Sequence, residues 1–298
     1  MAHDYKKLEA IGKGTFEIIN QARDMVKPGV RLLDVARKVE ELAKKKNVQF
    51  AFPINLSINE NAAHYTPSFE DPLTFSDKDV VKVDIGLRSG DNLTDCAVTV
   101  DLSGKYTKLM QATEEALDAA ISVVKEGRKV GDIGKEVEMV AKKYGVMPIK
   151  NLGGHGIDEG ELHANYFIPN YDNGDDTELV EGDLIAVEVF LTDGEGWVKN
   201  GEYNQIYQKS PGYTPRTNEM RVISEFIDEN YSTYPFALRW LVENFKSEFK
   251  VKAALNELAR QEALESFPVL VERKKGTVVQ FEKSVIVEKD SCKIITKP

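Results

Sequence analysis

The chain of 298 residues is long enough for one large domain or two smaller ones, and 42% hydrophobic with 30% charged residues is typical of a globular protein. Its net charge of -10 argues against nucleic-acid binding through a general basic surface, and no run approaches the roughly 20 apolar residues that a membrane-spanning helix needs. Two cysteines, Cys96 and Cys292, are too few for a disulfide framework. We therefore expect a cytoplasmic protein with free thiols and no direct nucleic-acid or membrane binding.

One segment of the chain occurs twice, at an offset of 98 residues. "VKPGVRLLDVARKVEELAKKKNV" (26–48) aligns without gaps to "VKEGRKVGDIGKEVEMVAKKYGV" (124–146), and ten of the 23 positions are identical. In both copies an aspartate, Asp34 or Asp132, precedes apolar residues at helical spacing. Each copy therefore predicts a helix that begins at an aspartate N-cap.

Each copy follows a further helical stretch, at roughly 6–26 and 106–125, and precedes segments with strand patterns. Two halves that each combine paired helices with strands predict an α+β fold with pseudo-twofold symmetry. A site between such halves would draw residues from both. A solenoid would need at least three repeats, so that interpretation is disfavoured.

The pattern of the two halves ends near residue 208. Residues 217–268 read as helices without a counterpart in either half, so we expect an inserted helical subdomain over 209–268. The chain then ends in "GTVVQFEKSVIVEKDSCKIIT", an alternating strand pair that should rejoin the main sheet. This assigns 1–208 and 269–298 to the main domain.

Two aspartates interrupt the apolar strands of a predicted hairpin, "VKVDIGLRSGDNLTDCAVTVD" (81–101). A turn centred between Ser89 and Gly90 would place Asp84 directly opposite Asp95. Opposed residues have Cβ atoms roughly 4.5 to 5.5 Å apart, where like charges are destabilising. A shared proton or a cation would neutralise them; a register shifted by one residue would instead turn both toward water.

Further metal-binding or acid–base side chains stand in unusual settings. Three of the four histidines lie beside glycine, small residues or proline: His64 in "NENAAHYTP", His155 in "NLGGHGI" and His163 in "GELHANYFIP". Glu188 in "DLIAVEVFLT" and Glu282 in "TVVQFEKSVIV" interrupt apolar strands, although either would be unremarkable if it faced solvent. Four carboxylates and one histidine suit two divalent metal ions that activate a water.

The order Asp84, Asp95, His155, Glu188, Glu282, with the aspartates eleven residues apart, resembles the methionine aminopeptidases and their relatives of the pita-bread fold. "AFPINLSINENAAHYTP", the helical insertion with "PFALRWL" inside it, and "VVQFE" are similar to the type 2 enzymes. The absence of a long charged N-terminal extension is more like the archaeal form. The resemblance covers essentially the whole chain and implies a pita-bread fold of duplicated halves, with an antiparallel sheet covered by helices.

The resemblance implies a role for each of the five candidate ligands. Asp84 would chelate one of two divalent ions, Asp95 and Glu282 would bridge both, and His155 with Glu188 would complete the other site. Co(II), Mn(II), Fe(II) and Zn(II) all suit such a ligand set.

The resemblance also implies the substrate-binding and catalytic residues. His64 and His163 would lie over the metals and touch the scissile amide, while Glu188 would act as the proton shuttle. Phe52, Leu162, His64 and His163 match the substrate-binding positions, and an apolar wall suits a thioether.

The implied activity is hydrolytic removal of the initiator methionine from nascent proteins and peptides with a small second residue. Ribosome association and a monomeric state are further expectations. Two alternatives stay open: a prolidase or aminopeptidase P with the same ligands, and a non-catalytic binding protein on the same fold.

Several positions depart from the family pattern without removing a ligand. Val189 stands where a proline usually follows the glutamate, and Lys283 and Ser284 replace a His-Thr pair. Asn165 replaces a common glycine, and Cys96 replaces a small hydroxyl residue beside Asp95. We expect these changes to affect pocket shape and rate.

Overall fold

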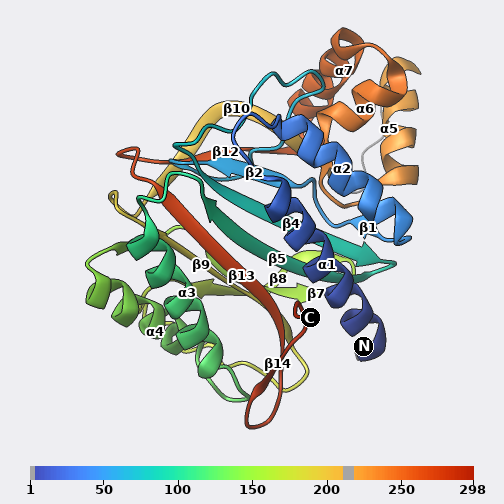
Figure 1. Ribbon diagram of the computed structural model, residues 1–298. Helices are drawn as coiled ribbons and strands as arrows, with labels where there is room; N and C mark the ends of the chain where they lie inside the picture. Colours follow the sequence, from blue (N-terminus) through green and yellow to red (C-terminus); the bar gives the residue numbers. More distant parts are fainter. Residues whose placement is uncertain (1–3, 211–217) are drawn as a thin grey trace.

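A computed structural model describes residues 4–210 and 218–298, and long curved strands run through its centre (Figure 1). The helices are α1 (Tyr5–Met25), α2 (Leu32–Lys45), α3 (Thr107–Ser122), α4 (Val130–Tyr144), α5 (Asn218–Asn230), α6 (Leu238–Phe245) and α7 (Glu248–Arg260). The strands are β1 (Gln49–Phe50), β2 (Asn55–Ile58), β3 (Asn61–Ala63), β4 (Val80–Ser89), β5 (Asn92–Asp101), β6 (Met147–Pro148), β7 (Gly153–Asp158), β8 (Glu161–Pro169), β9 (Leu184–Thr192), β10 (Val198–Lys209), β11 (Phe236–Ala237), β12 (Leu264–Glu272), β13 (Val278–Val287) and β14 (Cys292–Ile294).

Two antiparallel sheets form the framework of the described chain. The larger has 10 strands, with a main order of β1-β4-β5-β13-β9-β7-β8, and β14, β2 and β6 pair with β13, β4 and β9. The smaller has 4 strands in the order β11-β10-β12-β3. The predicted C-terminal strand pair, β13 and β14, joins the larger sheet, where β13 lies between β5 and β9. The strand β13 thus connects the two halves of the chain.

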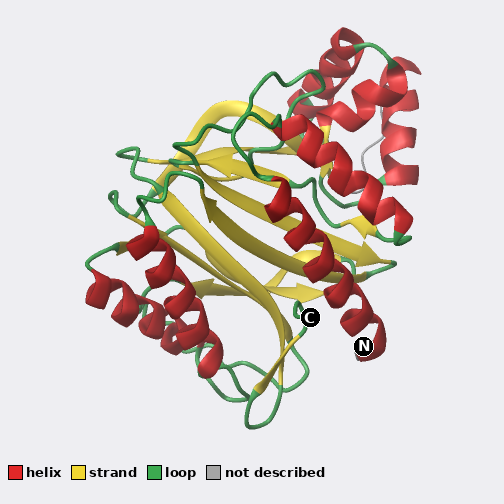
Figure 2. Ribbon diagram, in the orientation of Figure 1, coloured by secondary structure: helices red, strands yellow, loops and turns green. Residues whose placement is uncertain are grey.

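The four helices of the two halves cover one face of the larger sheet (Figures 1 and 2). Ile18 of α1 and Val39 of α2 pack with Val83 of β4, and Val137 of α4 packs with Val187 of β9. These are the paired helices that the duplication predicts, and α2 and α4 begin 98 residues apart, at residues 32 and 130. Side chains at alternate strand positions therefore point away from the helices, toward the opposite face.

The starts of the two repeated helices differ from the expectation. The N-caps are Arg31 and Lys129, and neither makes a side-chain capping bond. Asp34 lies in the first turn, where its Oδ1 accepts from Arg31 Nη2 at 2.6 Å, and Asp132 accepts from Arg128 at 3.2 Å. The predicted aspartate N-caps are wrong, because the N-caps lie three residues earlier. The carboxylates still lie near the positive end of the helix dipole.

The hairpin register also differs from the expectation. Ser89 pairs with Asn92 across a two-residue turn, so Asp84 faces Ala97, and Asp95 faces Gly86. The predicted direct opposition of the aspartates is wrong by one two-residue step along the ladder. Because side chains alternate with a period of two, this shift keeps both aspartates on the same face as diagonal neighbours.

The segment after β10 forms a helical layer at one end of the molecule (Figure 2). Ile227, Leu241 and Leu255 bring α5, α6 and α7 together in one apolar cluster. The strand β12 begins at Leu264 and pairs along β10, so the end of the segment predicted as helical is a strand. Residues 211–217 lie outside the described residues, and the domain boundaries at 208 and 269 stay a prediction.

None of the described helices is long and apolar enough to cross a membrane.

Two glycines in α1 offer a test of the packing between this helix and the end of the chain. A Cβ on Gly12 would lie 2.5 Å from the Ile295 carbonyl oxygen, whereas the nearest atom to one on Gly14 is 3.9 Å away. We expect Gly12→Ala to lower the free energy of unfolding by about 1–3 kcal/mol. The control Gly14→Ala should leave it unchanged or raise it by up to about 1 kcal/mol, through helix propensity. Urea unfolding at fixed metal concentration measures both, and equal effects would contradict this packing.

Candidate metal centre

The strand register brings four of the five candidate metal ligands together. Asp84 pairs with Ala97 of β5, Ala97 pairs with Glu282 of β13, and Glu282 pairs with Glu188 of β9. Three carboxylates therefore lie in one row across four neighbouring strands, on the face opposite the helices. Asp95 lies two positions from Ala97 and projects to the same face.

The fifth candidate ligand comes from the next strand of the sheet. His155 of β7 pairs with Ala186, which lies two residues before Glu188 on β9. Its Nε2 lies 3.7 Å from Asp95 Oδ2, and its side chain is buried. The first half of the chain thus supplies two aspartates, and the second half supplies the histidine and a glutamate.

Within the described chain, the five side chains form two overlapping groups with metal-binding geometry. Asp95, His155 and Glu282 form one, Asp84, Glu188 and Glu282 form the other, and the ligand atoms of each lie within 4.8 Å of one another. Both carboxylate oxygens of Glu282 and Oδ1 of Asp84 are buried without a hydrogen-bond partner. Orphaned carboxylate oxygens at this depth fit a bound cation, because they otherwise lack any compensation for desolvation.

Burial shifts the pKa values of the cluster toward its neutral forms. Burial raises the pKa of Asp84, Glu188 and Glu282 well above their ordinary values, and the neighbouring carboxylates add to this. Burial also raises the pKa of Asp95 to about 7. Burial lowers the pKa of His155 to about 4, so its imidazole is neutral at pH 7 and free to coordinate a metal. Without a cation the carboxyl groups must hold protons.

Gln280 of β13 supports this cluster and was not predicted from the sequence. Its Nε2 donates to Glu188 Oε1 at 2.7 Å and to Asp84 Oδ2 at 3.2 Å, and its side chain is fully buried. The signal in the sequence is its position two residues before Glu282, because strand alternation places both on one face. Gln280 orients two carboxylates that come from different halves of the chain.

A cavity of about 500 Å³ opens over the cluster. Its walls include Phe52, Leu162, His64 and His163, which are the four candidate substrate-binding residues, together with Glu188. The structure therefore brings these residues to the same place.

Phe52 lies against a backbone that has no side chain. A Cβ on Gly86 would lie 2.2 Å from the Phe52 ring, and Gly86 pairs with Asp95. The absence of a side chain at Gly86 therefore lets the pocket wall approach the strand that carries Asp84. Gly86 was not among the residues predicted from the sequence to form the site.

The two remaining histidines lie close to the cluster. The His163 ring packs edge-to-face on His155 with centroids 4.5 Å apart, and His64 Nδ1 lies 3.3 Å from the Pro268 carbonyl oxygen. Burial lowers the pKa of both His64 and His163 to about 4. Each imidazole is thus neutral at pH 7 and has one N–H, which in His64 lies on Nδ1 and is donated to the Pro268 carbonyl.

The departures from the family pattern have different surroundings. Val189 is buried among helix-facing residues, and Lys283 pairs with Asp118 at 3.7 Å, so neither faces the cavity. Ser284 Oγ both donates to the Asp95 carbonyl and accepts from its N–H at 2.8 Å, which fixes the ligand strand.

The two other departures are Asn165 and Cys96. Asn165 lines the cavity with a left-handed φ of 48°. Cys96 packs among the residues under α1 and α2, and burial raises its pKa to about 12, which keeps it a thiol. Of the departures, Asn165 therefore bears most directly on pocket shape.

Comparison with known proteins agrees with this geometry. The profile of metallopeptidase family M24 matches residues 6–289, so the chain belongs to this family of metal-dependent peptidases, which use divalent metal. The methionine aminopeptidase of Methanocaldococcus jannaschii is 39% identical over 293 residues, which cover 98% of both chains. That of Pyrococcus horikoshii is 40% identical over 295 residues, which cover 99% of this chain and 100% of the relative.

A solved structure confirms the predicted pita-bread fold. The methionine aminopeptidase of Thermotoga maritima superposes with a TM-score of 0.71 at 22% identity, covering 100% of both chains. At this identity the likeness concerns the fold alone.

The raised carboxyl pKa values predict that metal binding releases protons. Protons and metal ions compete for the same carboxylates. The metal affinity is therefore greatest above the pKa of Asp95, which is about 7 in the folded protein, and it is lost as the pH falls below that value. We expect the affinity for Mn(II) to rise roughly tenfold per displaced proton between pH 6 and pH 8. Calorimetric titration in two buffers of different ionisation enthalpy counts the protons; an affinity that does not change with pH would contradict the assignment.

The contacts of Gln280 predict a role in metal affinity. Gln280→Leu removes the donor to Asp84 and Glu188, and we expect metal affinity to fall about 10- to 100-fold. Gln205→Leu is a matched control, because Gln205 is a buried glutamine of β10 whose amide donates to the Asn204 carbonyl. Equal affinities in the two variants, measured by calorimetry, would show that Gln280 does not orient the ligands.

Proposed function

We propose that the protein is a methionine aminopeptidase, which removes the initiator methionine from nascent proteins and peptides with a small second residue. The main support is that a buried cluster of carboxylates and one histidine borders a cavity that is also lined by Phe52 and Leu162. Full-length relatives of this name, at 39% and 40% identity, support the same activity. An apolar wall suits the flexible thioether of methionine.

We propose that two divalent ions occupy the cluster, because its two ligand groups share Glu282. Co(II), Mn(II), Fe(II) and Zn(II) all suit an oxygen-rich set with one histidine. When bound, such ions supply Lewis acidity and lower the pKa of a water. The resemblance places Glu188 with His155 on one ion, whereas the structure groups Glu188 with Asp84. Which carboxylates bridge the ions stays a prediction.

The protein's own groups would perform the remaining steps. Glu188 lines the cavity as well as joining the cluster, so it can take a proton from the attacking water and deliver it to the leaving amine. The N–H of neutral His163 can stabilise the developing negative charge on the scissile carbonyl oxygen. Neutral His64 donates its N–H from Nδ1 to the Pro268 carbonyl, so its Nε2 can accept a hydrogen bond from the scissile amide. Phe52 and Leu162 would bind the methionine side chain and exclude water.

The partners and the setting of this reaction are proposed as well. The substrate is the free N-terminus of a peptide or nascent chain, which a protein of net charge -10 suits because that terminus is cationic. Ribosome association, a monomeric state and a cytoplasmic location stay predictions.

The activity test uses a Met-Ala-Ser peptide with Co(II), Mn(II), Fe(II) or Zn(II) added to metal-free protein. We expect release of free methionine with at least one metal, because the cluster and the apolar cavity adjoin. Turnover of X-Pro but not of Met-Ala peptides would favour a prolidase or aminopeptidase P. No turnover with any metal, together with only trace metal binding, would favour the non-catalytic alternative.

Two variants serve as controls for this test: one removes a candidate metal ligand, and the other changes a buried residue beside one. His155→Ala removes one candidate ligand and should abolish turnover while the fold remains. Cys96→Ala alters a buried residue next to Asp95 that packs toward the helices, and it should retain turnover. Circular dichroism verifies that both variants are folded.

A further inference from the structure

The backbone at His64 has an unusual conformation that its surroundings must maintain. His64 has a φ of 67°, in the left-handed region that side chains other than glycine rarely adopt. Its ring contacts β12 twice, through the Pro268 carbonyl at 3.3 Å and edge-to-face with Phe267 at 5.9 Å between centroids. Such backbone outliers cluster at functional sites, where neighbouring structure enforces them.

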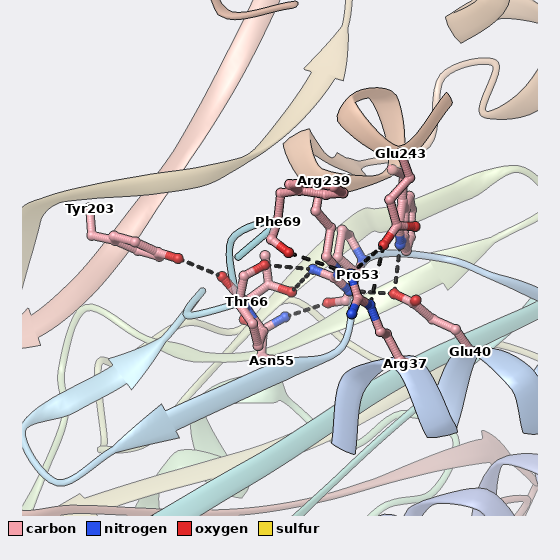
Figure 3. Close-up of polar contacts among 11 residues, drawn as sticks. Arg37, Glu40, Pro53, Asn55, Thr66, Phe69, Tyr203, Arg239 and Glu243 are labelled. Atoms are coloured by element: carbon pink, nitrogen blue, oxygen red, sulfur yellow. Dashed lines mark hydrogen bonds and ion pairs between the residues drawn. The ribbon is translucent and has the colours of Figure 1, made fainter. Parts of the chain in front are cut away.

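The residues that follow His64 are held by an arginine from the helical segment. Arg239 of α6 donates through Nη1 to Thr66 Oγ1 at 2.6 Å and to the Pro67 carbonyl at 3.1 Å (Figure 3). On the other side of the segment, Tyr203 of β10 donates to the Thr66 carbonyl at 3.1 Å. The two residues after Tyr65 are thus fixed on both sides.

The charge of Arg239 is balanced by a carboxylate from a third element. Its side chain is fully buried, and Nη2 donates to Oε1 of Glu40 on α2, which also accepts from Trp240 Nε1 at 2.6 Å. A buried guanidinium is tolerated only when it is paired and hydrogen-bonded. Its planar fork lets one side chain hold two partners in fixed directions. Arg239 therefore connects α6, α2 and the segment after His64.

We propose that Arg239 is a positioning residue for His64. By clamping Thr66 and Pro67 it fixes the segment that carries His64, and so keeps the imidazole at the wall of the cavity over the metal cluster. This inference rests on the proposed aminopeptidase function, and it gives the helical segment between β10 and β12 a role in the reaction.

The competing interpretation is that Arg239 only docks α6 on α2. Another ion pair already joins these two helices: Arg37 of α2 donates to Glu243 of α6 at 3.1 Å, and both side chains are partly exposed (Figure 3). Arg37 also reaches the Phe69 carbonyl at 3.4 Å, but it makes no hydrogen bond to Thr66 or Pro67. The two arginines thus share the docking role, and Arg239 alone of the two binds Thr66 and Pro67.

The first experiment compares Arg239→Met with the matched control Arg37→Met in the full-length, metal-loaded protein. We expect kcat on a Met-Ala-Ser peptide to fall about 10- to 100-fold in Arg239→Met, because small displacements of a reacting-site group have effects of this size. KM and the affinity for Mn(II) should stay within about twofold, because the ligands are untouched. Arg37→Met should keep the wild-type kcat.

The second experiment is a double-mutant cycle with His64→Ala. If Arg239 acts through His64, the double variant should be no slower than His64→Ala alone. Thr66→Val, which removes one acceptor while keeping the side-chain volume, should show the same lack of additivity and carries the test if Arg239→Met fails to fold.

The outcomes separate this inference from the proposed function. Additive losses in the cycle, or a kcat for Arg239→Met equal to that of Arg37→Met, would overturn the positioning role while leaving the aminopeptidase assignment intact. If Arg239→Met does not fold, the Thr66→Val variant decides instead. A loss of kcat in Thr66→Val that adds to the loss in His64→Ala would then overturn the positioning role. Absence of methionine release by the wild-type protein with every metal would reject the function, and this inference with it.

Discussion

The structure depends on one electrostatic constraint: four carboxyl groups converge at one buried place. Asp84, Asp95 and Glu282 are almost inaccessible, and two oxygens of Glu282 have no hydrogen-bond partner. Burying even one uncompensated charge costs several kcal/mol, so the cluster must hold either protons or cations. A metal ion that binds only the folded state then raises the free energy of unfolding, so metal binding and the stability of the sheet are coupled. The neutral His155 adds a nitrogen ligand to the carboxylates, and the amide of Gln280 holds one of them in place by a hydrogen bond.

The topology meets this constraint by drawing ligands from distant parts of the chain. The duplicated halves supply Asp84 and Glu188, and β13, which returns after the helical segment, supplies Glu282 between them. The same helical segment borders the cavity through Pro235, and β12, which follows it, does so through Phe267. The insertion in the sequence is therefore adjacent to the site in space, although no candidate ligand comes from it.

The sequence predicted features that local periodicity determines and missed those that depend on distant contacts. The repeat predicted α2 and α4, and alternation predicted that Asp84 and Asp95 share a face. Alternation fixes the face but not the register, so the turn moved the pairing by a full two-residue step. The ion pair between Glu40 and Arg239 joins residues 199 apart in the chain, and no local pattern announces such a contact. For the same reason the contacts of Gln280 were not predicted: they join β13 to Asp84 of β4 and Glu188 of β9, far apart in the chain.

Exposure distinguishes the roles proposed for the two glutamates. Glu282 belongs to both ligand groups, is only 2% exposed and does not line the cavity, so it is suited to holding cations. Glu188 is partly exposed and lines the cavity, so the same carboxylate reaches the cluster and a bound substrate. The proton shuttle proposed for Glu188 needs access to both donor and acceptor, and a group at this boundary has it. Burial and the neighbouring carboxylates raise the pKa of Glu188, so this carboxyl group holds a proton more readily than an exposed one does.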